Sequence, residues 1–242
     1  MAGLPLGFVG AEKELGPFQG EVNRLPGLQG WLDHLISWGG NGLLLGPIFT
    51  SSSHGYDTVD YFQIDPRLGD DADFDALVAA CQERGVRLLL DGVFNHAGRE
   101  FPPVARALAE GPGSGSADWV SRLYDTSGVI TADYFEGHDN LITLNHNSRL
   151  VQEYVREVML HWLRRGIDGW RLDAAYAVPA SFWAAVLPAV REEQHLTRTG
   201  HLGERDPRVP TSRIRLQQSR HIVRGATLRP RPLKNRCLRI VP

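Results

Sequence analysis

The segment Gly169-Trp170-Arg171-Leu172-Asp173 has the pattern of a short buried strand that ends on a carboxylate. Successive side chains of a strand point to opposite faces, so Arg171 and Asp173 share one face of it. A cation this close to an Asp favours the ionised form of its carboxyl group. The segment alone leaves two interpretations open. It is either an ion pair that only supports the structure, or a nucleophile at the carboxyl end of a parallel strand.

Upstream of this segment, strand-like and helix-like stretches alternate. Apolar runs predict three earlier strands, at residues 4–9, 43–45 and 86–93. Apolar residues at helical spacing predict helices over residues 28–36, 74–81 and 151–162. A last helix is expected to start at Pro179 and to kink at Pro188, near its end. Apolar strands separated by helices are typical of parallel sheets, so the sequence predicts an α/β fold with a parallel sheet or barrel.

Residues 94–147 interrupt this alternation. They are rich in Gly, Pro and Ser around residues 111–116, and aromatic residues are scattered through them. A stretch of this length between regular elements is usually a functional loop or a small inserted subdomain. We therefore expect a loop-rich insertion after the third strand.

The composition is that of an ordinary globular protein, with 242 residues and a formal net charge of −2. Two cysteines, Cys81 and Cys237, provide neither a disulfide framework nor a metal-binding spacing. No apolar run has the length of a membrane span, and the first ten residues lack the basic cluster of a signal peptide. We expect a cytoplasmic protein that contacts no membrane.

The last 49 residues, 194–242, differ from the rest. They hold 12 of the 26 Lys and Arg residues but only two of the 28 acidic residues, Glu204 and Asp206, and no Phe, Trp or Tyr. Clustered cations give sequence-independent affinity for phosphates, so nucleic-acid binding through this tail is one interpretation. It is a weak one, because the tail has no interleaved aromatic residues and no known motif. We therefore do not expect a nucleic-acid partner.

Polar motifs come after the predicted strands, where an enzyme barrel carries its active site. His54-Gly55-Tyr56-Asp57 comes after the second strand, Asn95-His96 after the third, and Asp173 ends the fourth. Loops at the carboxyl ends of barrel strands build the active site. We therefore expect these distant segments to meet at one mouth.

These motifs resemble the signatures of the alpha-amylase family of glycoside hydrolases (family 13). The matching segments are Asp91-Gly92-Val93-Phe94-Asn95-His96, Gly169–Asp173, His54-Gly55-Tyr56-Asp57 with Asp60-Tyr61, and Leu144-Asn145. Their order and spacing make the resemblance specific, and it covers the chain from about Leu25 to Glu193.

The resemblance implies the N-terminal part of a TIM barrel, (β/α)8, with about four of its strands. The implied division is a first barrel part at 1–93, an inserted domain at 94–148, a continuation with the nucleophile strand at 149–193, and a basic tail at 194–242, which we expect to be disordered. The implied activity is retaining hydrolysis of alpha-linked glucans such as starch and maltodextrins, in carbohydrate metabolism, with transglycosylation by the same mechanism as the alternative. An alpha-glucan or maltooligosaccharide is the expected partner.

The same resemblance assigns roles to individual residues. Asp173 is the implied nucleophile, and Arg171 holds it ionised. The implied sugar-binding residues are His54, Tyr56, Asp57 and His96. Asp91 supports the barrel mouth, and Asn95 is the position that ligates calcium in many relatives. His96 as a core histidine and Tyr56 as plain packing remain the alternatives.

Two departures separate this chain from strict alpha-amylases. Tyr176-Ala177 stands where many members have Lys-His after the nucleophile, so that contact with substrate is absent. Ile142-Thr143-Leu144-Asn145 lacks the calcium-binding Asp. Calcium therefore stays only a possible cofactor, and a maltodextrin-acting relative is the better expectation.

The second catalytic carboxyl group is the weakest part of the resemblance. Glu204 of Gly203-Glu204 lies 31 positions after Asp173 and is the candidate general acid, but Arg205-Asp206-Pro207 does not continue a strand. Codons for Arg205–Val209, read one base later, permit Val-Ile-His-Gly, which resembles the residues after the family's Gly-Glu. We therefore expect a reading-frame change or truncation in the tail, and an inactive chain. A genuine short variant with a basic tail is the alternative, and so is a non-catalytic carbohydrate-binding remnant.

Overall fold

The structure is a computed structural model that describes residues 2–3, 5–13, 23–201 and 238–239. Glu204 and most of the basic tail lie outside these residues, so the expectations placed on them are not tested by it. No helix in the described part of the chain is long and apolar enough to cross a membrane.

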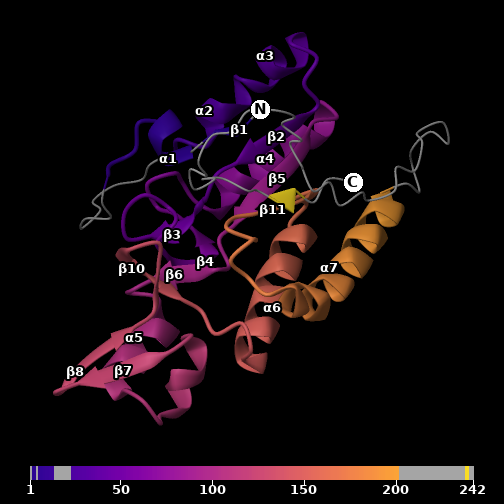
Figure 1. The fold of residues 1–242 in the computed structure, drawn as a ribbon. Helices are drawn as coiled ribbons and strands as arrows, with labels where there is room; N and C mark the ends of the chain where they lie inside the picture. The colour runs from indigo at the N-terminus through magenta and orange to yellow at the C-terminus, as the bar shows by residue number, and fades with distance from the viewer. Residues whose placement is uncertain (1, 4, 14–22, 202–237, 240–242) are drawn as a thin grey trace, which may run out of the picture.

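The central sheet consists of parallel strands in the order β1 (Ala2–Gly3), β2 (Gly42–Leu45), β5 (Arg87–Gly92) and β11 (Gly169–Leu172) (Figure 1). A short strand of the tail, β12 (Leu238–Arg239), pairs antiparallel with β11. Leu238 and Arg239 therefore differ from the disorder that was expected for the whole tail. The free edge of β11 offers unpaired backbone groups, with which another strand can pair. The register pairs Arg171 with Asp91, so both residues come to the same end of the sheet. The predicted α/β class is confirmed.

The first 40 residues differ from the prediction. The expected strand at residues 4–9 is wrong, since α1 (Pro5–Phe8) occupies this stretch and only β1 precedes it. Proline lacks the backbone N–H that a ladder needs, and its fixed φ suits the first turn of a helix. The helix predicted over residues 28–36 is divided into α2 (Pro26–Gln29) and α3 (Leu32–Ser37). The C-cap of α2 is Gly30, a poor helix former.

The crossover helices have the predicted pattern. The helix α4 (Asp71–Glu83) begins at a capping box, in which the carboxylates of Asp70 and Asp73 each accept a hydrogen bond from the other's backbone N–H. Helices α6 (Arg149–Arg164) and α7 (Ala180–His201) lie side by side next to β11 (Figure 1). Pro188 lies inside α7 rather than near its end. It is on the exposed face, where water can satisfy the carbonyl that its ring leaves unpaired.

Aromatic side chains fill the core beneath the carboxyl ends of the strands. The ring of Phe49 packs against those of Trp162, Tyr61 and Trp170, with centroids 5.2 to 6.2 Å apart. The indole N–H of Trp162 donates to the Tyr61 carbonyl at 2.8 Å. The Tyr61 hydroxyl lies 2.8 Å from the carbonyl of Val93 and 3.1 Å from that of His96. Tyr61 thus ties the chain after β5 to β4 (Thr58–Ile64), which forms a hairpin with β3 (Phe49–Ser51).

The segment predicted to be loop-rich is largely ordered. Its elements are β6 (His96–Gly98), α5 (Pro102–Glu110), the 3₁₀ helix η1 (Gly115–Trp119), β7 (Leu123–Thr126), β8 (Val129–Ala132), β9 (Tyr134–Phe135) and β10 (His138–Thr143). Strands β6, β10 and β9 form one antiparallel sheet, and β7 with β8 forms a separate hairpin. Ser127-Gly128, both with positive φ, make the two-residue turn of this hairpin.

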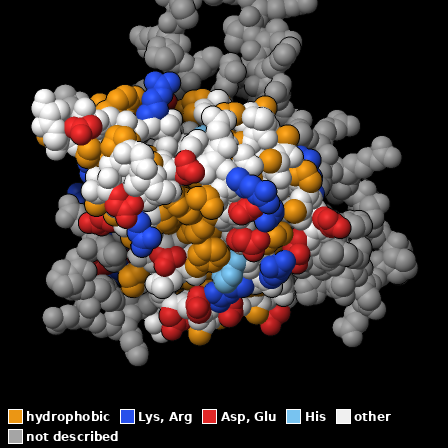
Figure 2. Space-filling model, turned by 90° about the horizontal axis from the view of Figure 1, so that it is seen from below, with side chains coloured by type: hydrophobic (Ala, Val, Ile, Leu, Met, Phe, Trp, Pro, Cys, Tyr) orange, Lys and Arg blue, Asp and Glu red, His pale blue; other side chains and the backbone are white. Residues whose placement is uncertain are grey.

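The surface carries apolar areas. Figure 2 shows hydrophobic side chains gathered in the middle of one face, with acidic and basic side chains around them. A separate apolar hollow lies where α1, α2 and α3 meet β2, and it is lined by Pro5, Phe8, Leu28, Trp31, Leu32, Leu35, Leu43 and Leu45. Large apolar patches on a protein surface typically mark faces that contact other molecules or segments.

Candidate active site

Arg171 holds two carboxylates at the carboxyl ends of neighbouring strands. Its guanidinium forms a short ion pair with Asp91 of β5, and its other terminal nitrogen lies 3.0 Å from an Asp173 oxygen. The two carboxylates differ in access. Asp91 is 2% exposed, whereas the side chain of Asp173 is 17% exposed. Asp173 is therefore the member of the pair that a ligand can reach.

Burial dominates the electrostatics of this trio. It raises the pKa of Asp91 to about 7, although the charge of Arg171 opposes the shift. Burial also raises the pKa of Asp173, and again Arg171 opposes it. The pKa of Tyr56 is raised to about 12 by burial first and then by the charges of Asp91 and Asp173. Tyr56 therefore lies close to both carboxylates.

The backbone aims the Asp173 side chain. Its N–H donates to the Gly92 carbonyl at 3.0 Å, which continues the β5–β11 pairing by one residue. The next residue, Ala174, has a φ of 43°, in the left-handed region that non-glycine residues rarely adopt. Such strain costs on the order of 1–3 kcal/mol and is concentrated at functional sites. The chain thus turns sharply away directly after the carboxylate.

His96 is buried as a neutral ring. Its imidazole stacks on Phe135 of β9 with centroids 4.7 Å apart and an interplanar angle of 19°. Burial lowers the pKa of His96 to about 4. Its Nδ1 lies 3.2 Å from the Asn95 amide nitrogen, and among the described residues its Nε2 has no hydrogen-bond partner. A buried polar nitrogen without a partner is rare in native structures and calls for an explanation.

The His54–Asp57 loop lies beside His96. Gly55 has a φ of 96°, which favours glycine, and the Tyr56 N–H donates to His54 Nδ1 at 3.2 Å. The backbone of Asp57 approaches Gly98 so closely that a Cβ there would lie 2.5 Å from the Asp57 carbonyl oxygen. The Asp57 carboxylate is buried, accepts a hydrogen bond from the Ser53 hydroxyl and faces His54 Nδ1 at 3.7 Å. The imidazole of His54 is more than half exposed.

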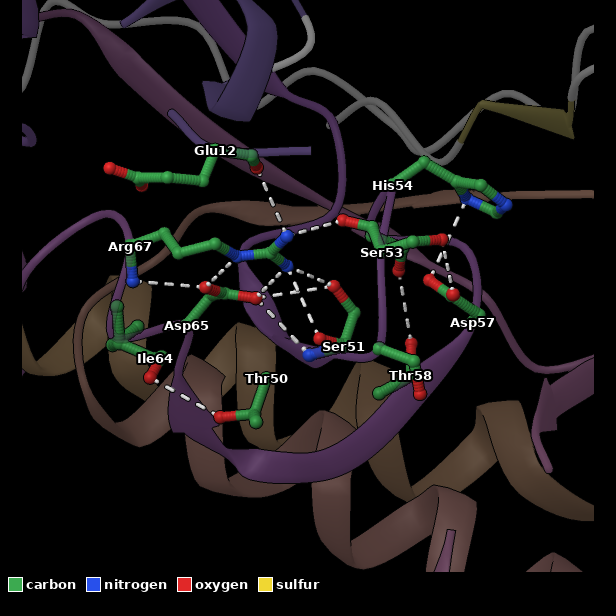
Figure 3. Close-up of polar contacts among 12 residues, drawn as sticks. Glu12, Thr50, Ser51, Ser53, His54, Asp57, Thr58, Ile64, Asp65 and Arg67 are labelled. Carbon is green, nitrogen blue, oxygen red and sulfur yellow. Dashed lines mark hydrogen bonds and ion pairs between the residues drawn. The ribbon is translucent and has the colours of Figure 1, made fainter. Parts of the chain in front are cut away.

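A buried ion pair between Asp65 and Arg67 contacts the residues directly before the His54–Asp57 loop. Arg67 and Asp65 are fully buried and pair at 2.6 Å (Figure 3). The Arg67 guanidinium also donates to the carbonyls of Ser51 and Ser53, and the Asp65 carboxylate accepts from the Ser51 N–H and hydroxyl (Figure 3). Sequence reasoning missed this pair. The available signal was an Arg two residues after an Asp, next to the motif loop.

The predicted site residues that the structure describes come together. The structure places Asp173, Arg171, Asp91, Tyr56, Asp57, His54 and His96 around the carboxyl ends of β5 and β11. Glu204 lies outside the described residues. Asn95 is buried beside His96. Within the described part, no three His, Cys, Asp or Glu side chains form a group that can hold a metal ion. Calcium takes about six to eight oxygen ligands, so Asn95 alone does not make a calcium site.

Comparison with known proteins identifies the family of the chain. The sequence model described as "Alpha amylase, catalytic domain" matches residues 18–209. This chain belongs to the alpha-amylase family. A cyclomaltodextrinase of a Bacillus species is 41% identical over 174 residues, which are 69% of this chain and 31% of that protein. The intracellular maltogenic amylase of Bacillus subtilis is 39% identical over 175 residues, or 70% of this chain and 29% of that enzyme.

A solved structure gives the same result for the alpha-amylase fold. The cyclic alpha-maltosyl-(1→6)-maltose hydrolase of Arthrobacter globiformis, in complex with maltose, superposes with a TM-score of 0.63 at 35% identity. The superposition covers 70% of this chain and 40% of that one. This alpha-amylase family chain thus spans about a third of the length of the curated relatives it matches.

Proposed function

We propose that this chain carries the nucleophile side of a retaining glycoside hydrolase site for alpha-linked glucans. The observation that carries the proposal is the placement of Arg171 between a buried Asp91 and an accessible Asp173 at the ends of adjacent strands. The relatives support the substrate class, since their names include a cyclomaltodextrinase, a maltogenic amylase and a hydrolase of a cyclic maltosyl-maltose. Asp173 is the nucleophile, and Asp91 supports the guanidinium that orients it.

The reaction proceeds by two displacements at the anomeric carbon. An Asp173 oxygen forms a bond to that carbon, the glycosidic C–O bond breaks, and the leaving oxygen takes a proton from a second carboxyl group. Water then attacks the same carbon, gives its proton back to that group and releases Asp173. Retaining enzymes place the two carboxyl groups about 5–5.5 Å apart. Arg171 favours the ionised, attacking form of Asp173 against the effect of burial.

The remaining motif residues bind the reacting sugar in this proposal. The neutral His96 presents Nε2 to a sugar hydroxyl, since its ring is fixed by Phe135 and Asn95. Tyr56 offers a ring face next to the carboxylates. The exposed His54 hydrogen-bonds the sugar beside His96, and the buried Asp57 carboxylate faces His54 Nδ1 at 3.7 Å. The buried Asp65–Arg67 pair keeps their loop in place.

The other catalytic group that the mechanism needs is the second carboxyl group, the general acid. Glu204 remains our candidate general acid, and the family match ends at residue 209, shortly after it. The loss of aromatic residues and the excess of Arg after Gln194 support the proposal that a reading-frame change alters the chain here and leaves it without hydrolytic activity. Resequencing the gene and translating all frames beyond the Glu193 codon tests this. A confirmed single frame, together with starch cleavage by the purified chain, would refute it.

An activated substrate tests the nucleophile without the second carboxyl group. In α-maltosyl fluoride the C–F bond breaks and fluoride leaves without a proton, so formation of the Asp173–carbon bond needs no general acid. We expect a burst of about one fluoride per chain and then slow release, because water attack lacks its base. Asp173→Asn should abolish the burst. A burst of equal size in the variant would remove Asp173 from this role.

A non-catalytic alpha-glucan-binding protein is the second candidate. Two other carboxylates lie near Asp173, and both have partners: Asp91 pairs with Arg171, and Glu136 accepts a hydrogen bond from Tyr176. Neither is therefore placed to act as the general acid, which favours this candidate. This alternative gives retention on amylose resin without any fluoride burst. Nucleic-acid binding stays the weaker alternative, and it depends on the Arg-rich tail, most of which lies outside the described residues. Retention on heparin of the full chain but not of residues 1–193 would favour it.

A further inference from the structure

The last strand of the central sheet, β12, runs against the direction of the other strands (yellow in Figure 1). Strands β1, β2, β5 and β11 are parallel to their neighbours, whereas β12 pairs antiparallel with β11. A further strand of the repeating strand–helix pattern would lie parallel to β11, after a right-handed crossover. β12 is therefore an addition to the edge of the sheet and not the next strand of that pattern.

β12 covers the part of β11 that lies next to the carboxylate. The register pairs Leu238 with Leu172 and Arg239 with Arg171, the two residues directly before Asp173. On its other side, β11 pairs with β5 along its whole length. Within the described residues, β12 is the only strand on the outer side of β11. Without β12, the backbone N–H and C=O groups there would face solvent, and such an edge is a template for a strand of another chain.

β12 itself offers little to a further strand. It has two residues, one of them an arginine, and Pro242 follows three positions after Arg239. Short edge strands, charged residues and prolines are means by which proteins protect the edge of a sheet from pairing. The strand at the opposite edge, β1, also has only two residues. Both edges of the central sheet are thus closed by strands too short to serve as templates.

The sequence around β12 explains why this part of the tail forms the strand. Four apolar residues surround one Arg in Cys237-Leu238-Arg239-Ile240-Val241, and Ile and Val are β-branched. No other window of five residues in 194–242 is as apolar. Branched apolar residues favour a pleated, half-buried surface, so this segment is the part of the basic tail best suited to pair with a sheet.

We propose that the outer edge of β11 is an interaction surface for an extended strand, and that β12 occupies this edge and so prevents two copies of the chain from pairing there. The partner that β12 excludes is a second copy, whose own β11 presents the same edge. Two identical strands related by a two-fold axis perpendicular to them run antiparallel, as β11 and β12 do here. The inference does not depend on the proposed function, because it uses only the backbone pairing of the sheet.

Replacing both Leu238 and Arg239 by Pro in the full chain tests the proposal. Of two successive strand residues, one directs its N–H to the neighbouring strand, and proline has no N–H to donate. We expect backbone hydrogen–deuterium exchange in residues 169–173 to become about five- to thirtyfold faster, the factor that loss of one or two hydrogen bonds gives. Size-exclusion chromatography with light scattering should show a monomeric wild type and a variant that forms dimers or larger species.

The tail provides a matched control, because Leu228-Arg229 is the same dipeptide outside β12. Replacing these two residues by Pro should change neither the exchange of residues 169–173 nor the monomeric state. A synthetic peptide of residues 236–242, added to the variant with prolines at 238 and 239, should restore the monomer and the slow exchange. The same peptide with those two prolines should not.

Several results would overturn the proposal. One is a wild-type chain that already associates, and another is equal exchange of residues 169–173 in wild type and variant. A variant with faster exchange that stays monomeric would show that β12 pairs with β11 without excluding a second copy. Circular dichroism confirms the folding of both variants. If the variant unfolds, the wild type alone decides: exchange of residues 238–239 as fast as in the free peptide would show that β12 does not pair with β11.

Discussion

Replacing Arg171 by Met tests the electrostatic centre of the site. Met keeps an unbranched apolar side chain of similar reach but removes the cation that pairs with both Asp91 and Asp173. Asp91 is then left buried and ionised at alkaline pH, without its main partner. Removing one partner of a buried ion pair typically costs about 3–5 kcal/mol. Protonation of Asp91, whose pKa is already about 7, limits the loss to about 1.4 kcal/mol for each pH unit above 7. We therefore expect the free energy of unfolding to fall by about 1–2 kcal/mol at pH 8.

The loss should depend on pH in a defined direction. The pKa of Asp91 is already raised to about 7, and removal of an opposite charge raises it further. Between its ordinary pKa and this raised value, the folded variant binds more protons than the unfolded chain does, so its stability falls as pH rises. At pH 5 the carboxyl group is protonated and the penalty of an unpaired charge disappears. The difference from wild type should therefore be much smaller at pH 5 than at pH 8.

Urea unfolding monitored by circular dichroism at both pH values measures these quantities. The control is Arg149→Met, because Arg149 also pairs with a carboxylate, that of Glu153, but its side chain is 89% exposed. Exposed pairs contribute about 0–1 kcal/mol, so this variant should lose little at either pH. The reasoning is refuted if Arg171→Met loses the same free energy at pH 5 as at pH 8, since the cost would then be one of packing.

Three further changes address other parts of the site. Tyr56→Ala should weaken maltooligosaccharide binding about tenfold without altering the circular dichroism spectrum, and unchanged affinity in calorimetry would make Tyr56 a packing residue. His96 has a pKa lowered from 6.5 to about 4, so the unfolded chain takes up its proton first and wild-type stability falls as pH drops from about 6.5 to 4. In His96→Gln that fall should be smaller by up to about 3 kcal/mol, and identical pH profiles in urea unfolding would contradict the buried neutral ring. Asp65→Asn leaves the charge of Arg67 buried with a weaker partner and should lower the free energy of unfolding by about 3–5 kcal/mol; a loss below about 1 kcal/mol would show that the pair is not needed to hold the loop.

The sequence predicts the strands of the nucleophile side because their signals are local. Continuous apolar runs identify β2 and β5, and the alternation of Trp170, Arg171 and Leu172 identifies the buried and polar faces of β11. The Arg171–Asp173 pair can be inferred from that alternation alone. The pairing of Arg171 with Asp91 cannot, because it depends on the register between two strands that lie 80 residues apart.

The parts that sequence reasoning missed depend on contacts between distant segments. Strands of two to four residues in the inserted segment are too short to show a period, so the sequence predicts a loop there. The stacking of Phe135 on His96 and the bridge from Glu136 to Tyr176 exist only because this segment folds back over the site. At the N-terminus, Pro5 outweighed an apolar run that was expected to be a strand.

The most direct test of the central claim is to find where the glycosyl group is attached. The full chain is incubated with 5-fluoro-α-glucosyl fluoride, in which the ring fluorine slows water attack, and it is then digested at low pH for peptide mass spectrometry. We predict one added fluoroglucosyl group, on the peptide that contains Asp173, with fragmentation placing it on that residue and with no adduct in Asp173→Asn. An adduct on another residue, or no adduct although wild-type chain binds maltotetraose, would contradict the assignment of Asp173 as the nucleophile.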